Sequence, residues 1–149
     1  RSDNGADLVS LYAVDPESDN VADRNGMPER LIYGLIDFKI KVDTPGSSTT
    51  VTILLPESVP EGYKWYKYSQ TQGWYDFSPN VSFSSERNQL SFTLVDGGTG
   101  DDDGERDGII ADPSGLGLAP ADSAPTNTES SGGGGSGGCF IDALFKNLR

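Results

Sequence analysis

Short apolar runs rich in β-branched and aromatic residues recur between residues 8 and 95, and glycine, proline or polar residues end each of them. The clearest run spans residues 31–42. Within it, Phe38, Ile40 and Val42 alternate with two lysines. A period of two places the apolar side chains on one face of an extended strand. The pattern predicts about six or seven short strands in an antiparallel β-sandwich, either immunoglobulin-like or jelly-roll-like.

The spacing of the runs also predicts how some of them pair. Residues 49–55 follow a turn at Pro45-Gly46, and we expect them to pair antiparallel with residues 31–42. The aromatic segment 63–77 suits a hairpin closed by the loop 69–73. The other expected features are strands at 8–14, 81–84 and 89–95, a polar loop at 15–28, and core positions at Tyr33, Leu35, Phe38, Ile40, Val51, Ile53, Phe92 and Leu94.

The composition changes after residue 95 and sets the expected domain limits. We expect one β-sandwich domain at 1–118, which includes an acidic, glycine-rich loop at 96–112. Residues 119–138 pass from a Pro/Ser/Thr linker into a glycine-rich spacer, which predicts a flexible tail. Residues 139–149 regain apolar character. Because the chain starts without the regions of a signal peptide, we interpret it as a mature fragment or a processed C-terminal piece.

Charge and composition exclude several classes of function. The net charge of -12 opposes binding to nucleic acid or anionic lipid, which normally needs clustered lysine and arginine. The chain has no histidine, so it has neither a Ser-His or Cys-His nucleophile pair nor a histidine metal site. A two-carboxylate glycosidase would need a carboxylate in apolar surroundings, whereas most acidic residues here lie in polar stretches. We therefore expect a protein that is not an enzyme.

Four longer blocks of the chain form a recognisable series. They are YGLIDFKI (33–40), VTILLPESVPEG (51–62), YKYSQTQGWYDFS (66–78) and DGGTGDDDGERDGIIADPSG (96–115). In this order they resemble the bacterial domain family called choice-of-anchor U, whose members sit near the C-terminal end of long exported proteins, just before a surface-sorting tail. The resemblance implies a role beside an anchor and no established catalysis. The glycines and Cys-Phe-Ile at 137–141 are similar to the start of such a tail, but the chain departs from the familiar Ala/Thr-rich continuation at Asp142.

The acidic loop has the residue types of a site for a hard cation. Its central carboxylates occupy alternate positions, as the first ligands of an EF-hand calcium loop do. The twelfth position is Ser114 rather than glutamate, which excludes an intact EF-hand. Like charges in a short loop repel one another, and a divalent cation would relieve that repulsion. We expect calcium to bind Asp96, Asp101, Asp103, Glu105, Asp107, Ile109 and Asp112, the alternative being a solvated acidic turn.

The aromatic hairpin admits two interpretations. Trp65, Trp74 and Tyr75 are candidates for a sugar-stacking platform, because aromatic faces pack on the apolar faces of pyranose rings. The alternative is ordinary cross-strand aromatic pairing, which we favour. Alternation along the first strand places Trp65 on one face and Tyr66 and Tyr68 on the other, and one face has to meet the core.

Cys139 is the only cysteine, so no disulfide can form within the chain. It follows a flexible spacer, and its expected use is attachment by lipidation, by an intermolecular disulfide or by transfer to a surface carrier. The apolar residues that follow it recur at helical spacing and suit docking on a partner subunit or at a membrane. These residues are Phe140, Ile141, Leu144, Phe145 and Leu148.

These features together predict an extracellular, cell-surface structural module that anchors a larger exported protein or assembly. The first alternative is a subunit of an extracellular filament or sheath, a homo-oligomer held by the C-terminal tail of a neighbouring copy. The second is a carbohydrate-binding module. The expected partners are other surface or filament subunits through residues 139–149 and a membrane only through a modified Cys139, with no nucleic acid.

Overall fold

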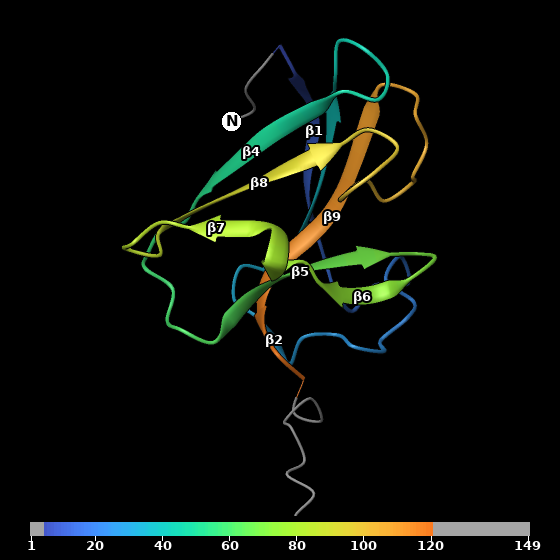
Figure 1. Ribbon diagram of the computed structural model, residues 1–149. Helices are drawn as coiled ribbons and strands as arrows, with labels where there is room; N and C mark the ends of the chain where they lie inside the picture. The colour runs from blue at the N-terminus through green and yellow to red at the C-terminus, as the bar shows by residue number, and fades with distance from the viewer. Residues whose placement is uncertain (1–4, 121–149) are drawn as a thin grey trace, which may run out of the picture.

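The computed structural model describes residues 5–120, and this part of the chain folds into two antiparallel sheets packed face to face (Figure 1). The all-β sandwich is therefore confirmed. One short 3-10 helix, η1, interrupts the strands. The elements are β1 (Asp7–Val14), β2 (Arg30–Leu31), β3 (Leu35–Lys41), β4 (Ser48–Leu54), β5 (Tyr63–Ser69), β6 (Gly73–Asp76), η1 (Ser78–Asn80), β7 (Val81–Phe83), β8 (Gln89–Val95) and β9 (Ile109–Leu118).

The larger sheet has the strand order β1-β3-β9-β5-β6, and the smaller sheet has the order β4-β8-β7. Strand β9 is central in the larger sheet, because β3 and the short β2 pair with one of its sides and β5 pairs with the other. Strands β5 and β6 form the predicted hairpin, in which Tyr68 lies opposite Trp74. The chain therefore crosses from one sheet to the other after β3, after β4, after β6 and after β8.

The predicted pairing of 31–42 with 49–55 is wrong. Strand β3 pairs with β1 and β9, whereas β4 belongs to the other sheet and pairs with β8. The turn at Pro45-Gly46 carries the chain between the sheets instead of closing a hairpin. The run 31–42 is also broken by a turn before Gly34, whose φ of 73° suits glycine. Tyr33 in this turn is 43% exposed, so its assignment to the core is wrong.

Strand β9 was not expected from the sequence, although it organises the larger sheet. Its residues include Pro113 and two glycines, which are unfavourable inside a central strand. The pairing with β5 ends at Ser114, so Pro113 lies where β9 is paired only with β3. The strand accepts proline because its second side is no longer part of a ladder at that point.

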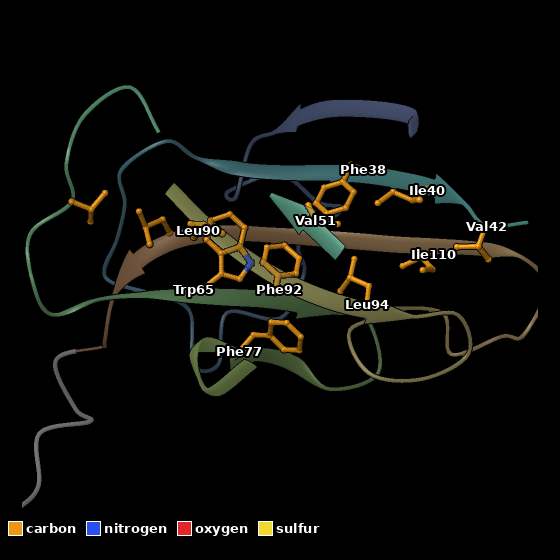
Figure 2. Packing of buried hydrophobic residues seen from close by; sticks show 12 residues of the cluster. Phe38, Ile40, Val42, Val51, Trp65, Phe77, Leu90, Phe92, Leu94 and Ile110 are labelled. Atoms are coloured by element: carbon orange, nitrogen blue, oxygen red, sulfur yellow. The ribbon is translucent and has the colours of Figure 1, made fainter. Parts of the chain in front are cut away.

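The main core lies between the two sheets (Figure 2). Trp65 and Phe77 each contact Phe92 of the smaller sheet, with ring centroids 5.7 Å and 6.0 Å apart. Most of the predicted core residues are confirmed here, and Ile53 packs against this cluster while partly buried. The buried members are Phe38, Ile40, Val42, Val51, Val59, Trp65, Phe77, Leu90, Phe92, Leu94, Ile110 and Leu116.

A second, smaller cluster covers the outer face of the larger sheet. Tyr66, Tyr68 and Trp74 of the hairpin pack there with Leu35 and with Val21 from the long loop between β1 and β2. The loop predicted at 15–28 is thus a loop, but its Val21 is buried. The larger sheet is covered on both faces near the hairpin, which explains why both faces of β5 carry aromatic residues.

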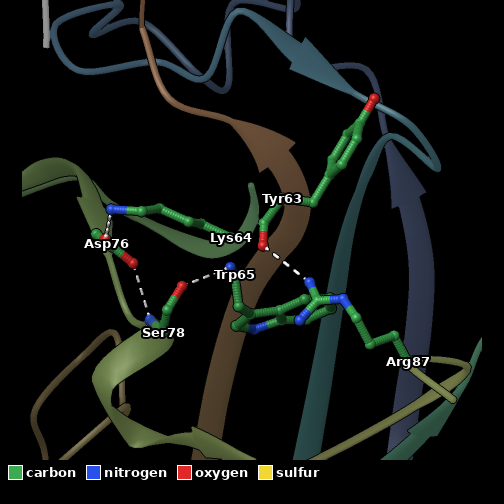
Figure 3. Close-up of polar contacts among 6 residues, drawn as sticks. All are labelled: Tyr63, Lys64, Trp65, Asp76, Ser78 and Arg87. Atoms are coloured by element: carbon green, nitrogen blue, oxygen red, sulfur yellow. Dashed lines mark hydrogen bonds and ion pairs between the residues drawn. The ribbon is translucent and has the colours of Figure 1, made fainter. Parts of the chain in front are cut away.

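Polar contacts hold the segments beside β5 (Figure 3). Asp76 accepts hydrogen bonds from Lys64 at 2.6 Å and from the Ser78 backbone N–H at 2.9 Å. The Ser78 hydroxyl oxygen in turn accepts a hydrogen bond from the Trp65 backbone N–H at 2.9 Å. From the other side, the Arg87 guanidinium donates to the Tyr63 carbonyl oxygen at 3.4 Å. These bonds attach the first half of β5 to the end of β6, to the start of η1 and to the turn between β7 and β8.

Candidate functional site

The acidic loop leaves the smaller sheet at the end of β8 and joins the larger sheet at the start of β9. Its first residue, Asp96, is only 1% exposed. One carboxylate oxygen accepts the Gly46 N–H at 2.6 Å, and the other accepts the Gly108 N–H at 3.0 Å. Asp96 therefore joins the turn after β3 to the residue that precedes β9.

Asp101 forms a second bridge between the loop and β9. Its two carboxylate oxygens accept the Gly97 N–H at 2.8 Å and the Ala111 N–H at 3.0 Å. Burial raises the pKa of Asp101, and these two N–H groups offset part of the rise. We call Asp96 and Asp101 the base residues of the loop, because both are buried and both hold backbone N–H groups of neighbouring segments.

The middle of the loop differs from its base. Asp103, Glu105 and Asp107, which we call the crest residues, are exposed. Asp103 accepts the Glu105 N–H and Asp107 accepts the Ile109 N–H, each at 2.8 Å and each two positions along the chain. These are local Asx turns, so the crest carboxylates shape the loop from its own neighbours.

Asp112 lies inside the sandwich, on the same face of β9 as the core residues Ile110 and Leu116. Its Oδ2 is 2.5 Å from Nζ of Lys67 in β5, and both side chains are 0% exposed. Burial raises the pKa of Asp112, while Lys67 and the Ser114 hydroxyl counteract part of that rise. The larger sheet thus holds a fully buried ion pair that faces the core.

Lys67 was not among the site residues predicted from the sequence, although the sequence carried a signal for it. In β5, Lys67 is two positions from Trp65, so alternation places both side chains on the same face. A tryptophan that faces the core therefore requires the lysine to face it too. For Asp112, proximity to the acidic loop suggested a loop ligand, but the residue lies within β9.

The predicted calcium ligands lie in different parts of the structure. The base residues hold backbone N–H groups, Asp112 pairs with Lys67 in the interior, and the crest residues are exposed. Ile109 is the first residue of β9. Within residues 5–120, no group of three or more His, Cys, Asp or Glu side chains is placed to hold a metal ion. Calcium binding stays a prediction, and it depends on the crest residues.

The aromatic candidates do not share one surface. Trp65 is 2% exposed in the main core, and Trp74 is 6% exposed in the cluster on the opposite face of the sheet. Tyr75 is half-buried, with its ring 6.4 Å from that of Phe77. Trp74 stacks on Tyr68 with ring centroids 5.4 Å apart, as expected for cross-strand aromatic pairing.

An apolar groove opens between the sheets at the side where β1 and β4 form their edges. Its volume is about 220 Å³. Beside it, β1 exposes Leu8 and Leu11, each to more than half of its surface. The residues that line the groove are Leu8, Leu11, Ile36, Phe38, Ile40, Val51, Thr52 and Ile53.

The remaining predictions concern the tail and the membrane. Cys139 and the residues that follow it lie outside the described part of the chain. Among residues 5–120, no helix has the length and apolar character needed to cross a membrane.

Comparison of the chain with protein-family models, curated proteins and solved structures gave no match.

Proposed function

We propose that this chain is a non-enzymatic extracellular spacer that tethers a larger exported protein or assembly to a cell surface. The path of the chain through the larger sheet carries the proposal. Strands β1 and β9 are both antiparallel to β3, which lies between them, so they run in the same direction. The chain therefore enters this sheet at one end and leaves it at the other (Figure 1).

This path suits a module that is pulled from its two ends. Backbone hydrogen bonds between antiparallel strands are perpendicular to the strands. Tension along β1 and β9 loads the ladders on both sides of β3 in shear, so that many bonds resist it together. The acidic loop adds to this arrangement, because the base residues attach β9 to the segments around it. The resemblance to anchor-adjacent domains supports the same function.

Single-molecule force spectroscopy tests the proposal. Handles at the two ends of the chain load β1 and β9 in shear, whereas a handle on a Ser85→Cys variant of a chain with Cys139→Ser pulls at the turn between β7 and β8. We expect pulling from the two ends to need the larger force. Pulling between residue 85 and the C-terminal end should peel the smaller sheet apart at a lower force. Equal forces in the two geometries would contradict the proposal.

The groove between β1 and β4 favours a second candidate, a filament or sheath subunit. An apolar surface beside two sheet edges can accept an added segment from another chain. The occupant that we propose is the segment 139–149 of a neighbouring copy, which has five large apolar residues among eleven. The linker 119–138 is long enough to reach a neighbouring molecule, at roughly 3.3 Å for each extended residue.

Oligomeric state distinguishes this candidate from a monomeric spacer. Light scattering should show assemblies of the full chain that disappear when residues 139–149 are removed. Leu11→Asp, which adds a charge to the groove, should have the same effect without removing the tail. A full chain that stays monomeric at high concentration would reject the filament candidate and leave the spacer proposal untouched.

A further inference from the structure

Lys67 and Asp112 form an unusual pair, because both charged side chains are fully buried between the sheets. Lys67 Nζ and Asp112 Oδ2 are 2.5 Å apart, yet neither Nζ nor either carboxylate oxygen has a partner with the geometry of a hydrogen bond. An ammonium group has three donors to satisfy and a carboxylate has two acceptor oxygens. A buried ion pair is stabilising only when such additional bonds are made. The pair is therefore costly as it stands.

The surroundings of the pair are largely apolar and aromatic. The Phe77 ring centroid lies 5.3 Å from Lys67 Nζ. In the strand registers, Phe38 is opposite Asp112, and Tyr75 and Ser114 are opposite Lys67 on its two sides. Burial raises the pKa of Asp112, which favours the neutral carboxylic acid over the carboxylate. A carboxylic acid is the form that can condense with a primary amine to give an amide.

From this geometry we propose that Lys67 and Asp112 form an intramolecular isopeptide bond. The Lys67 Nζ lone pair attacks Cγ of the Asp112 carboxyl group, and a new C–N bond forms. One C–O bond of the carboxyl group then breaks, and its oxygen leaves with two protons from the amine and the acid as one water molecule. No oxidation or reduction takes place, and no other reactant is needed.

Two neighbouring groups suit the proton movements of this step. The Ser114 hydroxyl lies near the Asp112 carboxyl group and, with Lys67, offsets part of the rise in pKa that burial causes, so it can stabilise charge that develops on a carboxyl oxygen. Asp102 is half-buried, and burial raises its pKa, while the Ser69 hydroxyl and the charge of Lys67 offset part of the rise. An atom of this carboxylate, Oδ1, is buried without a hydrogen-bond partner. Asp102 is thus a candidate relay that takes up the proton lost by the amine and passes it to the leaving oxygen.

The bond would replace two buried ions by one neutral amide and would link β5 covalently to β9. Strand β9 is the strand by which the chain leaves the larger sheet, so the link would hold its middle to the neighbouring hairpin. This inference goes beyond the proposed function and does not depend on it, since the bond is a property of the folded domain alone.

Mass spectrometry of the full chain tests the proposal. After folding and alkylation of Cys139, the intact mass should be one water molecule lower than the mass calculated for the alkylated sequence. Trypsin should then fail to cleave after Lys67 and should yield the peptide 65–87 joined to the peptide 107–146. The Lys67→Arg variant keeps the positive charge but has no primary amine, so it should have the full mass of its sequence.

A parent chain with the full mass of its sequence and normal cleavage after Lys67 would overturn the proposal and would leave the pair as a buried salt bridge. Because this result is read from the parent chain, it does not depend on whether any variant folds. It is also independent of the force measurement, so the spacer proposal and the isopeptide proposal can fail separately.

Discussion

The base residues and the crest residues of the acidic loop are all acidic, but they differ in burial and in the segments to which they are hydrogen-bonded. Asp96 and Asp101 are buried and hold N–H groups from segments that are distant in sequence or belong to β9. Asp103 and Asp107 are exposed, and among residues 5–120 each accepts a hydrogen bond from an N–H group two positions along the chain. The difference shows that the carboxylates of this loop have two separate roles. The base residues hold neighbouring segments of the domain together, and the crest residues remain exposed to solvent, where they are the candidates for calcium binding.

The largest expected loss of stability comes from a change in the buried pair of Lys67 in β5 and Asp112 in β9. Lys67→Met should lower the free energy of unfolding by about 3–5 kcal/mol, because it leaves Asp112 buried without its partner. Urea denaturation of the variant and the parent measures the difference. The double variant Lys67→Met with Asp112→Leu is the control, and it should recover part of the loss since both charges are removed. A single variant as stable as the parent would mean that the interior tolerates an unpaired Asp112.

Removing a base residue should have the next largest effect. Asp96→Ala leaves the Gly46 and Gly108 N–H groups without their acceptor and should cost about 2–4 kcal/mol, since each buried, unsatisfied donor costs about 1–3 kcal/mol. The matched control is Asp107→Ala in the same loop, for which we expect a change below about 1 kcal/mol. Equal losses in the two variants would remove the distinction between base and crest.

Calcium is expected to act through the crest. If the crest residues bind it, millimolar calcium should raise the thermal midpoint, with a stabilisation of about 2.7 kcal/mol at a hundred times the dissociation constant. Thermal unfolding in chelator and in calcium gives this shift, and Asp103→Ala combined with Asp107→Ala should abolish it. Identical midpoints of the parent chain in both conditions, with no binding heat in calorimetry, would identify the crest as a solvated acidic turn.

The smallest expected effect is that of pH. Burial raises the pKa of Asp101 and of Asp102 above the ordinary value of 3.8, so the folded chain binds protons more tightly than the unfolded chain. Stability should therefore rise slightly as the pH falls from about 7 toward about 4, through the raised folded pKa values. Denaturation midpoints across this range measure the trend. Asp102→Asn should weaken it, and a steady fall in stability over the same range would contradict the expected sign.

The strands were predictable where local pattern and burial agree. Alternation identified β3, short apolar runs with β-branched residues identified β4 and β8, and the aromatic halves identified the β5–β6 hairpin. Local pattern carries no information on which sheet a strand joins, so the partner of β4 was predicted wrongly. Strand β9 was missed because Pro113 and its glycines resemble a loop, and only its position beside β3 makes it a strand.

The sequence predicted which residues make up the acidic loop, but it did not predict which of their side chains are buried and which are exposed. The acidic residues after residue 95 indicated an organised loop, but nothing in their order separates Asp101 from Asp103. Their difference arises from tertiary burial, which depends on β9 and on the turn after β3. The burial of Lys67 could have been predicted, because Lys67 is two positions from Trp65 in β5 and its side chain therefore lies on the same face of the strand.

The most direct test of the distinction between base and crest compares Asp101→Asn with Asp103→Asn by urea denaturation. Both substitutions remove one negative charge, keep the size of the side chain and lie two positions apart. If burial and hydrogen bonding determine what each carboxylate contributes to stability, Asp101→Asn should lower the free energy of unfolding by about 1–3 kcal/mol. The reason is that the Gly97 and Ala111 N–H groups bind different carboxylate oxygens, and an amide has only one oxygen. Asp103→Asn should then stay within about 0.5 kcal/mol of the parent. Equal stabilisation by both substitutions would show instead that charge repulsion governs the whole loop.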